Sequence, residues 1–172
     1  MLDKGPRPMT DFVPGPDTAR AFRDALGCFA TGVTIVTCKT EDGPLAIAAI
    51  SFSSLSLDPP LVLWSPAKTS RRFPPFKAAA HYAIHVLTAD QAALCQLFAR
   101  DGTAFADISW SAGAHGVPLI DGCLARFECT QNAIHDGGDH VIIVGEVTRA
   151  ETTHAAPLVF SKGSYGRFTG NE

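Results

Sequence analysis

Four serines lie within six residues between Ser51 and Ser56, in a stretch that ends at Asp58-Pro59-Pro60. Two short apolar runs, 45–50 and 61–64, flank this stretch, and their length, lack of helical spacing and bounding prolines predict two buried strands. Serine hydroxyls at the end of a strand, together with the backbone N–H groups freed there, are able to hold an anion. The alternative is a Ser-rich turn that satisfies its own backbone, and composition alone favours this alternative.

A second polar group follows the strand 61–64. Its members are Ser65, Lys68, Ser70, Arg71 and Arg72. Ser70 is predicted to cap a short helix that Pro74 and Pro75 interrupt. A helix N-terminus with hydroxyl groups and either arginine beside it is typical of a phosphate site. The alternative is a solvated, basic start of a helix.

Two further candidates lie near the C-terminus. His140 follows the turn 136–139 and begins an apolar strand. It is either a functional imidazole or a strand-start histidine that hydrogen-bonds the turn. Tyr165, in the segment 163–168, is either a ring that stacks on a ligand or a core tyrosine.

The elements that would position these residues are short and mostly extended. Strands are predicted at 33–38, 45–50, 61–64, 82–87, 123–134, 141–147 and 158–161, and helices at 17–30, capped by Asp17, and 90–100, capped by Asp90. Residues 101–122 are expected to form an irregular surface excursion. Because turns or single helices connect the strands without a regular βαβ alternation, the predicted fold is mainly β, an antiparallel Greek-key barrel with peripheral α-helices.

Composition limits the class of protein. The 172 residues are 46% hydrophobic and 18% charged, which predicts one folded domain over 17–172 behind a loose, Pro-rich arm at 1–16. A net charge of -3 gives no support for nucleic-acid binding, and no apolar run reaches the roughly 18 residues of a membrane span. The first residues lack the apolar core of a signal peptide, so a cytoplasmic protein is expected. The five cysteines and six histidines show no metal-site spacing, and no disulfide is expected.

The segment from Ser51 to Leu63 resembles a signature of the flavin reductase-like family, the short FMN-binding split barrels. Other pieces match at similar spacing: Ala30-Thr31-Gly32-Val33-Thr34-Ile35-Val36-Thr37, Gly138-Asp139-His140, Gly145-Glu146-Val147, and Pro157-Leu158 followed by Gly163-Ser164-Tyr165. The resemblance spans roughly Phe22 to Phe168. It implies a six-stranded split barrel, usually a homodimer with its flavin sites at or near the subunit interface.

The resemblance also implies an activity. The chain would be an NAD(P)H:flavin oxidoreductase that transfers a hydride from NADH or NADPH to FMN or FAD and supplies reduced flavin to a partner monooxygenase. The cofactor-binding residues implied are Ala49 and Ile50 for the isoalloxazine, through their backbone, and Ser51, Ser53, Ser54, Ser65, Lys68, Ser70 and Arg71 for ribityl and phosphate oxygens. His140 and Tyr165 would contact the nicotinamide. Hydride transfer needs no protein base, so His140 is expected to position the ring.

Three positions depart from the family pattern. Ala46, Ala48 and Ile50 stand where members commonly carry Gly, Thr, and Asn or Ser, and their side chains cannot hydrogen-bond a flavin. These departures leave FMN versus FAD and loose versus tight flavin binding open. NADH versus NADPH also stays open, because the basic residue that a 2′-phosphate needs has no predicted position. The alternatives are a split-barrel flavoprotein whose tightly bound flavin acts directly on a small molecule, and a non-catalytic flavin-binding dimer.

Overall fold

The structure is a computed structural model, and residues 9–170 are described. The first half of the predicted N-terminal arm lies outside this range, so the arm stays a prediction. No helix in the described range is long and apolar enough to cross a membrane. Helical elements are few and short, namely η1 (Pro16–Thr18), α1 (Ala19–Leu26), α2 (Phe73–Ala78), α3 (Ala92–Arg100) and η2 (Ala114–Gly116).

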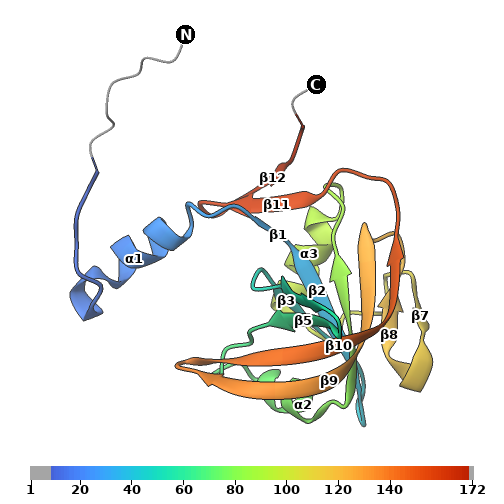
Figure 1. Ribbon diagram of the computed structural model, residues 1–172. Coiled ribbons are helices and arrows are strands. Elements are labelled where there is room, and N and C mark those ends of the chain that lie inside the picture. Colours follow the sequence, from blue (N-terminus) through green and yellow to red (C-terminus); the bar gives the residue numbers. More distant parts are fainter. Residues whose placement is uncertain (1–8, 171–172) are drawn as a thin grey trace.

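Strands make up most of the regular structure (Figure 1). They are β1 (Thr31–Gly32), β2 (Thr34–Thr40), β3 (Gly43–Ala49), β4 (Ser53–Leu57), β5 (Pro60–Trp64), β6 (His81–Val86), β7 (Trp110–Ala112), β8 (Pro118–Ile120), β9 (Ala125–Gly137), β10 (His140–Thr152), β11 (Leu158–Ser161) and β12 (Ser164–Arg167). The mainly β class predicted from the sequence is confirmed.

The main sheet has seven strands in the order β3-β2-β6-β9-β10-β5-β4, and every pairing in it is antiparallel. This is one strand more than the six that the resemblance implies. The strand of this sheet that the sequence did not predict is β4, which comes from the serine stretch itself and pairs with β5 at the edge of the sheet. Two smaller sheets, β1-β11-β12 and β7-β8, complete the fold.

Two apolar clusters hold the sheet and the helices together. Trp64, Phe76 and Ile143 are at most 1% exposed in the cluster that fills the barrel, and Phe98 of α3 is fully buried in the second. The segment 101–122, expected to be a surface excursion, contributes to this packing. Ile120 is 2% exposed in β8, because the β7-β8 hairpin folds back over the sheet.

The predicted helix 17–30 is shorter than expected. Asp17 lies in η1, and α1 follows Thr18, which makes no side-chain cap, so the predicted Asp17 cap is wrong. Phe22, Leu26 and Phe29 are 42%, 58% and 78% exposed, because the helix stands away from the barrel (Figure 1). Backbone N–H of Lys162 donates to the carbonyl of Gly27 at 2.8 Å, which fastens the base of this helix to the β11-β12 turn.

Two other predicted caps also differ. Ser70 lies before α2, whose N-cap is Arg72. Pro74 and Pro75 fall in the first turn of α2, where a missing N–H removes no helical hydrogen bond, so they begin the helix instead of interrupting it. Asp90 accepts a hydrogen bond from the Thr88 hydroxyl at 2.5 Å and does not cap α3.

Candidate functional site

A groove of about 290 Å³ lies where β3 and β5 end and β10 begins. The predicted site residues that line it are Ala49, Ile50, Ser51, Ser65, Ser70 and His140. An adjoining hollow shares Ile47, Ala48 and Ser70 with this groove and adds Arg71 and Arg72. The fold therefore brings together most of the residues singled out from the sequence, although they come from four separate segments.

Ser51 joins the ends of the two strands on either side of the groove. Its hydroxyl accepts a hydrogen bond from backbone N–H of Ser65 at 2.9 Å and lies 3.3 Å from the carbonyl of the same residue. This is the behaviour expected of a serine that satisfies neighbouring backbone. The contact fixes the groove wall, since β3 and β5 do not pair with each other in the sheet.

Ser53 and Ser54 do not line the groove. They lie on the edge strand β4, opposite Leu63 and Val62, and both are exposed. The Ser53 hydroxyl donates to the carbonyl of Ser54 at 3.1 Å. Their role in holding a cofactor stays a prediction that the groove geometry does not support.

His140 stands at the tip of the β9-β10 hairpin, where that tip meets the loop after β5. Its Nδ1 lies 2.8 Å from Oδ1 of Asp139, and this hydrogen bond lowers the pKa of the Asp139 carboxyl. Backbone N–H of Lys68 donates to the carbonyl of Asp139 at 2.9 Å, and that of Val141 to Pro66 at 3.2 Å. The imidazole is thus oriented through Nδ1, while its side chain stays 45% exposed at the groove.

Lys68 directs its charge toward the hairpin instead of the groove. Its ammonium group donates to the carbonyl of Gly138 at 2.6 Å and pairs with Asp136, whose pKa this contact lowers. Arg71, in contrast, lines the adjoining hollow, is exposed and takes part in none of the ion pairs within residues 9–170. Of these two cations, Arg71 is therefore the one available to a phosphate.

Tyr165 lies apart from the groove, on β12 of the smaller sheet. Its ring centroid is 5.3 Å from that of Phe160, and its hydroxyl is 3.3 Å from Sγ of Cys95. The contact with Cys95, together with burial, raises the pKa of Tyr165 to about 12. Tyr165 is nevertheless 37% exposed, so it is not the core tyrosine of the alternative, and a nicotinamide contact by Tyr165 stays a prediction.

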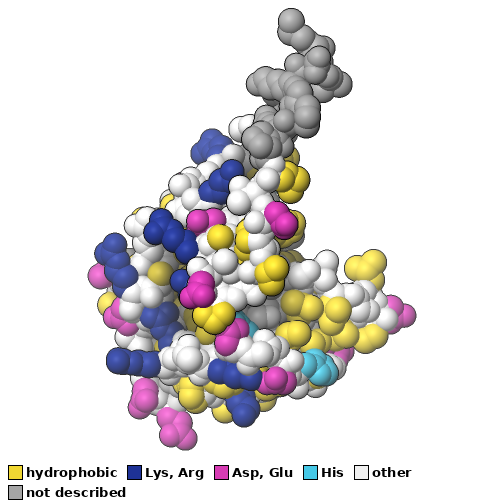
Figure 2. Space-filling view, turned by 90° about the vertical axis from the view of Figure 1, so that its left-hand side faces the viewer, with side chains coloured by type: hydrophobic (Ala, Val, Ile, Leu, Met, Phe, Trp, Pro, Cys, Tyr) yellow, Lys and Arg dark blue, Asp and Glu magenta, His cyan; other side chains and the backbone are white. Residues whose placement is uncertain are grey.

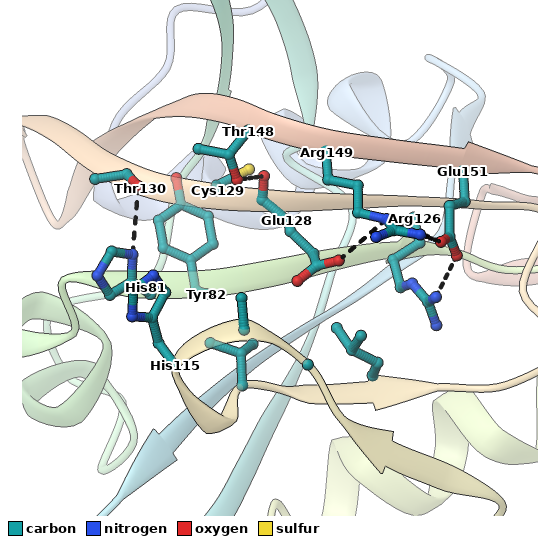
Figure 3. A pocket seen from close by; sticks show the side chains of 14 residues that line it. His81, Tyr82, His115, Arg126, Glu128, Cys129, Thr130, Thr148, Arg149 and Glu151 are labelled. Carbon is teal, nitrogen blue, oxygen red and sulfur yellow. Dashed lines mark hydrogen bonds and ion pairs between the residues drawn. The ribbon is translucent and has the colours of Figure 1, made fainter.

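A second hollow, of about 450 Å³, lies between the loop 113–119 and the outer face of β9 and β10 (Figure 3). At one end the rings of His81 and His115 stack with centroids 3.7 Å apart. At the other end Arg149 bonds Glu151 at 2.8 Å. The sequence did not point to this hollow, because the alternation along β9 predicts a solvated outer face there.

The charged groups of the second hollow are matched within it. Glu151 also pairs with Arg126, and Glu128 lies 3.9 Å from Arg149, so two arginines face two glutamates (Figure 3). Within residues 9–170 no group of three or more His, Cys, Asp or Glu side chains is placed to hold a metal ion. The groove near His140 is therefore the stronger candidate for a site that binds an anionic cofactor.

Comparisons with known proteins identify the family of the chain. The model of the flavin reductase like domain family matches residues 26–169. The chain is 58% identical over 158 residues to FMN reductase (NADH) SmoA of Agrobacterium fabrum, covering 92% of this chain and 91% of that protein. It is 40% identical over 148 residues to HsaB of Rhodococcus jostii, a flavin-dependent monooxygenase reductase subunit, covering 85% and 76%.

The fold is also found in solved structures. The NADH:FAD oxidoreductase SgcE6 of Streptomyces globisporus superimposes with a TM-score of 0.87 at 33% identity, over 95% of this chain and 100% of that one. Nitrilotriacetate monooxygenase component B from Mycobacterium thermoresistibile gives a TM-score of 0.85 at 38% identity, over 89% and 88%. The chain therefore belongs to the flavin reductase like domain family.

Proposed function

We propose that this chain transfers a hydride from NADH or NADPH to FMN or FAD, and that the reduced flavin leaves to serve a separate monooxygenase component in the cytoplasm. The observation that carries the proposal is the groove with its adjoining hollow. Together they place Arg71, which forms no ion pair within residues 9–170, and the oriented His140 beside the apolar end of β3 in a member of this family. SmoA is named an FMN reductase (NADH) and SgcE6 an NADH:FAD oxidoreductase, which favours NADH as donor.

The groove residues fit a flavin. Ser70 and Arg71 offer a hydroxyl and a cation to a phosphate. Ala48 and Ala49 are small, so the backbone of β3 stays accessible to a flat ring with its own donors and acceptors. When bound, the flavin supplies the hydride acceptor. The protein supplies orientation, since hydride transfer depends on distance and alignment.

His140 positions the nicotinamide in this assignment. Its Nδ1 is committed to Asp139, which leaves Nε2 to face the second substrate. A ring held in this way can donate or accept one hydrogen bond to the carboxamide without taking part in the chemistry.

The departures from the family pattern weaken flavin binding less than the sequence indicates. Ala46 is fully buried, and its backbone N–H donates to Gly102 at 2.8 Å, so this position does not face the groove. Ala48 and Ile50 do line it. Two lost hydrogen bonds, about 1–3 kcal/mol in total, are compatible with a flavin that dissociates after each turnover.

The assay that tests the proposal is NADH oxidation with FMN, with FAD and with no flavin added. Turnover that requires added flavin is expected. Turnover by a yellow protein without added flavin would instead favour the tightly bound flavoprotein. An enzyme that binds flavin yet oxidises neither NADH nor NADPH would overturn the proposal in favour of the non-catalytic dimer.

His140→Ala is expected to lower kcat/KM for NADH by about 30-fold, because the nicotinamide loses one orienting contact near the reacting atoms. Flavin affinity, measured by quenching of flavin fluorescence, should change by no more than about twofold. His135→Ala, on the exposed part of β9, serves as the control and should leave both constants unchanged. Equal loss of flavin affinity and NADH turnover would contradict the assignment of His140 to the nicotinamide.

A homodimer is part of the proposal. The apolar side chains of Phe22, Leu26 and Phe29 are exposed to solvent, and burying them against a partner would be favourable. The helix α1, which carries the first two, is hydrogen-bonded to the β11-β12 turn at its C-terminal end. Figure 2 shows hydrophobic side chains exposed over the face of the molecule that carries α1. A second copy of the chain supplies such a partner and agrees with the subunit organisation that the resemblance implies.

Leu26→Asp is expected to weaken the dimer by about 10- to 100-fold, the effect of withdrawing one buried leucine from an apolar contact. Sedimentation velocity across a concentration series measures the dissociation constant. Arg20→Ala, on the same helix, is the control and should leave it unchanged. A wild-type chain that sediments as a monomer at high concentration would refute the dimer and leave the hydride-transfer assay as a separate question.

A further inference from the structure

The adjacent residues Arg71 and Arg72 have different surroundings, although the sequence offers them as equal phosphate ligands. Arg72 is partly buried, and its guanidinium bonds three backbone carbonyls. Nη1 donates to Phe98 at 2.5 Å and to Ala46 at 3.4 Å, and Nη2 donates to Ala99 at 3.4 Å. Arg71 is exposed at the hollow beside the groove.

The acceptors of Arg72 explain why an arginine is needed there. Phe98 and Ala99 belong to the last turn of α3, which ends at Arg100, and the last carbonyls of a helix have no partner within it. A cation at this end also interacts favourably with the helix dipole. The planar, forked guanidinium can reach both carbonyls together with Ala46 of β3, whereas an ammonium group has no such fork.

Gly102 shows how closely the three segments meet. A Cβ at Gly102 would lie 2.6 Å from the carbonyl oxygen of Ala46 and 2.8 Å from Nε of Arg72. Only a glycine leaves room for the arginine against the strand. The backbone N–H of Arg72 also donates to the Ser70 hydroxyl at 3.2 Å. The segment 70–72 is thus anchored to α3 and β3 through one side chain.

We propose that Arg72 is a positioning residue that holds the segment 70–72 against α3 and β3, so that of the two arginines only Arg71 meets the flavin phosphate, and the pair sets the preference for phosphorylated flavins over riboflavin. This inference rests on the proposed flavin reductase function. Because the guanidinium of Arg72 donates its hydrogen bonds to backbone carbonyls, Arg72 contributes to phosphate binding only by placing Arg71.

The test is a double-mutant cycle in the NADH oxidation assay, with FMN and riboflavin compared as the variable substrate. Arg71→Gln is expected to raise KM for FMN about 10-fold, the effect of losing one charge-assisted contact, and to change KM for riboflavin no more than about twofold. Arg72→Gln should raise KM for FMN about 5-fold and should also change KM for riboflavin no more than about twofold. The double variant should match Arg71→Gln alone, because Arg72 acts through Arg71.

Each other outcome has a distinct meaning. Multiplied effects on KM for FMN in the double variant would overturn the proposal, because Arg72 would then bind phosphate itself. An unchanged KM for FMN in Arg72→Gln would also overturn it and would leave only a structural role. Arg72→Lys keeps the charge without the fork, and its smaller rise in KM for FMN tests the same idea if the glutamine variant does not fold. Absence of wild-type turnover with any flavin would refute the reductase function itself, which separates the two failures.

Discussion

Gly145→Ala is expected to lower the free energy of unfolding by about 3 kcal/mol, the upper range for a core position with no room for an added methyl group. A Cβ at Gly145 would lie 2.1 Å from the hydroxyl oxygen of Tyr82, 2.8 Å from Cζ of the same ring and 3.1 Å from Cβ of Cys129. Tyr82 is 1% exposed, and a contact of 2.1 Å is too short to be relieved by a shift of a few tenths of an ångström. Denaturant unfolding followed by fluorescence measures the loss.

A second substitution separates the clash from any general intolerance at this strand. Tyr82→Phe removes the atom at 2.1 Å and should recover part of the loss in Gly145→Ala, with the contact at Cζ remaining. Among residues 9–170 the buried Tyr82 hydroxyl has no hydrogen-bond partner, so its removal alone should cost little. Gly166→Ala on β12, where a Cβ meets nothing within 4 Å, is the neutral control. An equal loss in the two alanine variants would refute the steric explanation.

Stability is expected to fall by about 3 kcal/mol as the pH drops from 6.5 to 4, through His85 alone. Burial lowers the pKa of His85 from 6.5 to about 4, a backbone hydrogen bond to Ile35 opposes this shift, and the charge of Arg126 adds to it. Nε2 accepts from backbone N–H of Ile120 at 3.0 Å, so Nδ1 carries the proton and donates to the carbonyl of Ile35 at 3.1 Å. A second proton would face the N–H of Ile120.

The sign follows from the two states. Between pH 6.5 and 4 the unfolded chain protonates this histidine and the folded chain does not, so protons favour unfolding; below about pH 4 both states are protonated and the loss is complete. His85→Gln keeps an acceptor for Ile120 but cannot titrate. It should be less stable than the wild type at pH 7.5 and should show a pH slope shallower by about one proton. Parallel stability curves for the two proteins would contradict the linkage.

Hydrophobic patterning was sufficient to predict most of the sheet. The runs around β2, β3, β5, β6, β9 and β10 are apolar enough to be predicted as strands. The turn between Thr40 and Gly43 pairs β2 with β3, as expected. The edge strand β4 was missed because Leu55 and Leu57 are exposed, so the stretch carries no buried face to recognise. The segment 101–122 was misjudged because its run of buried residues, 117–120, is short and contains a proline.

The site could be predicted in part, for a similar reason. The local sequence and the resemblance were enough to predict that polar groups at strand ends, such as Ser65 and His140, belong to the site. The local sequence does not reveal which cation of the segment 68–72 is free to bind a ligand. Lys68 pairs with Asp136 on a hairpin far along the chain, and Arg72 bonds the end of α3. His85 shows the same limit, since its partners Ile35 and Ile120 are brought to it only by the tertiary fold.

The tie between the loop after β5 and the hairpin tip bears on how the reaction tolerates motion. Ala67 bridges to His140, and Lys68 and Val141 add backbone bonds on either side. The β9-β10 hairpin projects beyond the body of the barrel (Figure 1), so a small tilt of the hairpin displaces its tip more than its base. Because the loop assigned to the flavin phosphate is bonded to the tip assigned to the nicotinamide, a tilt of the hairpin is expected to move these two binding positions together.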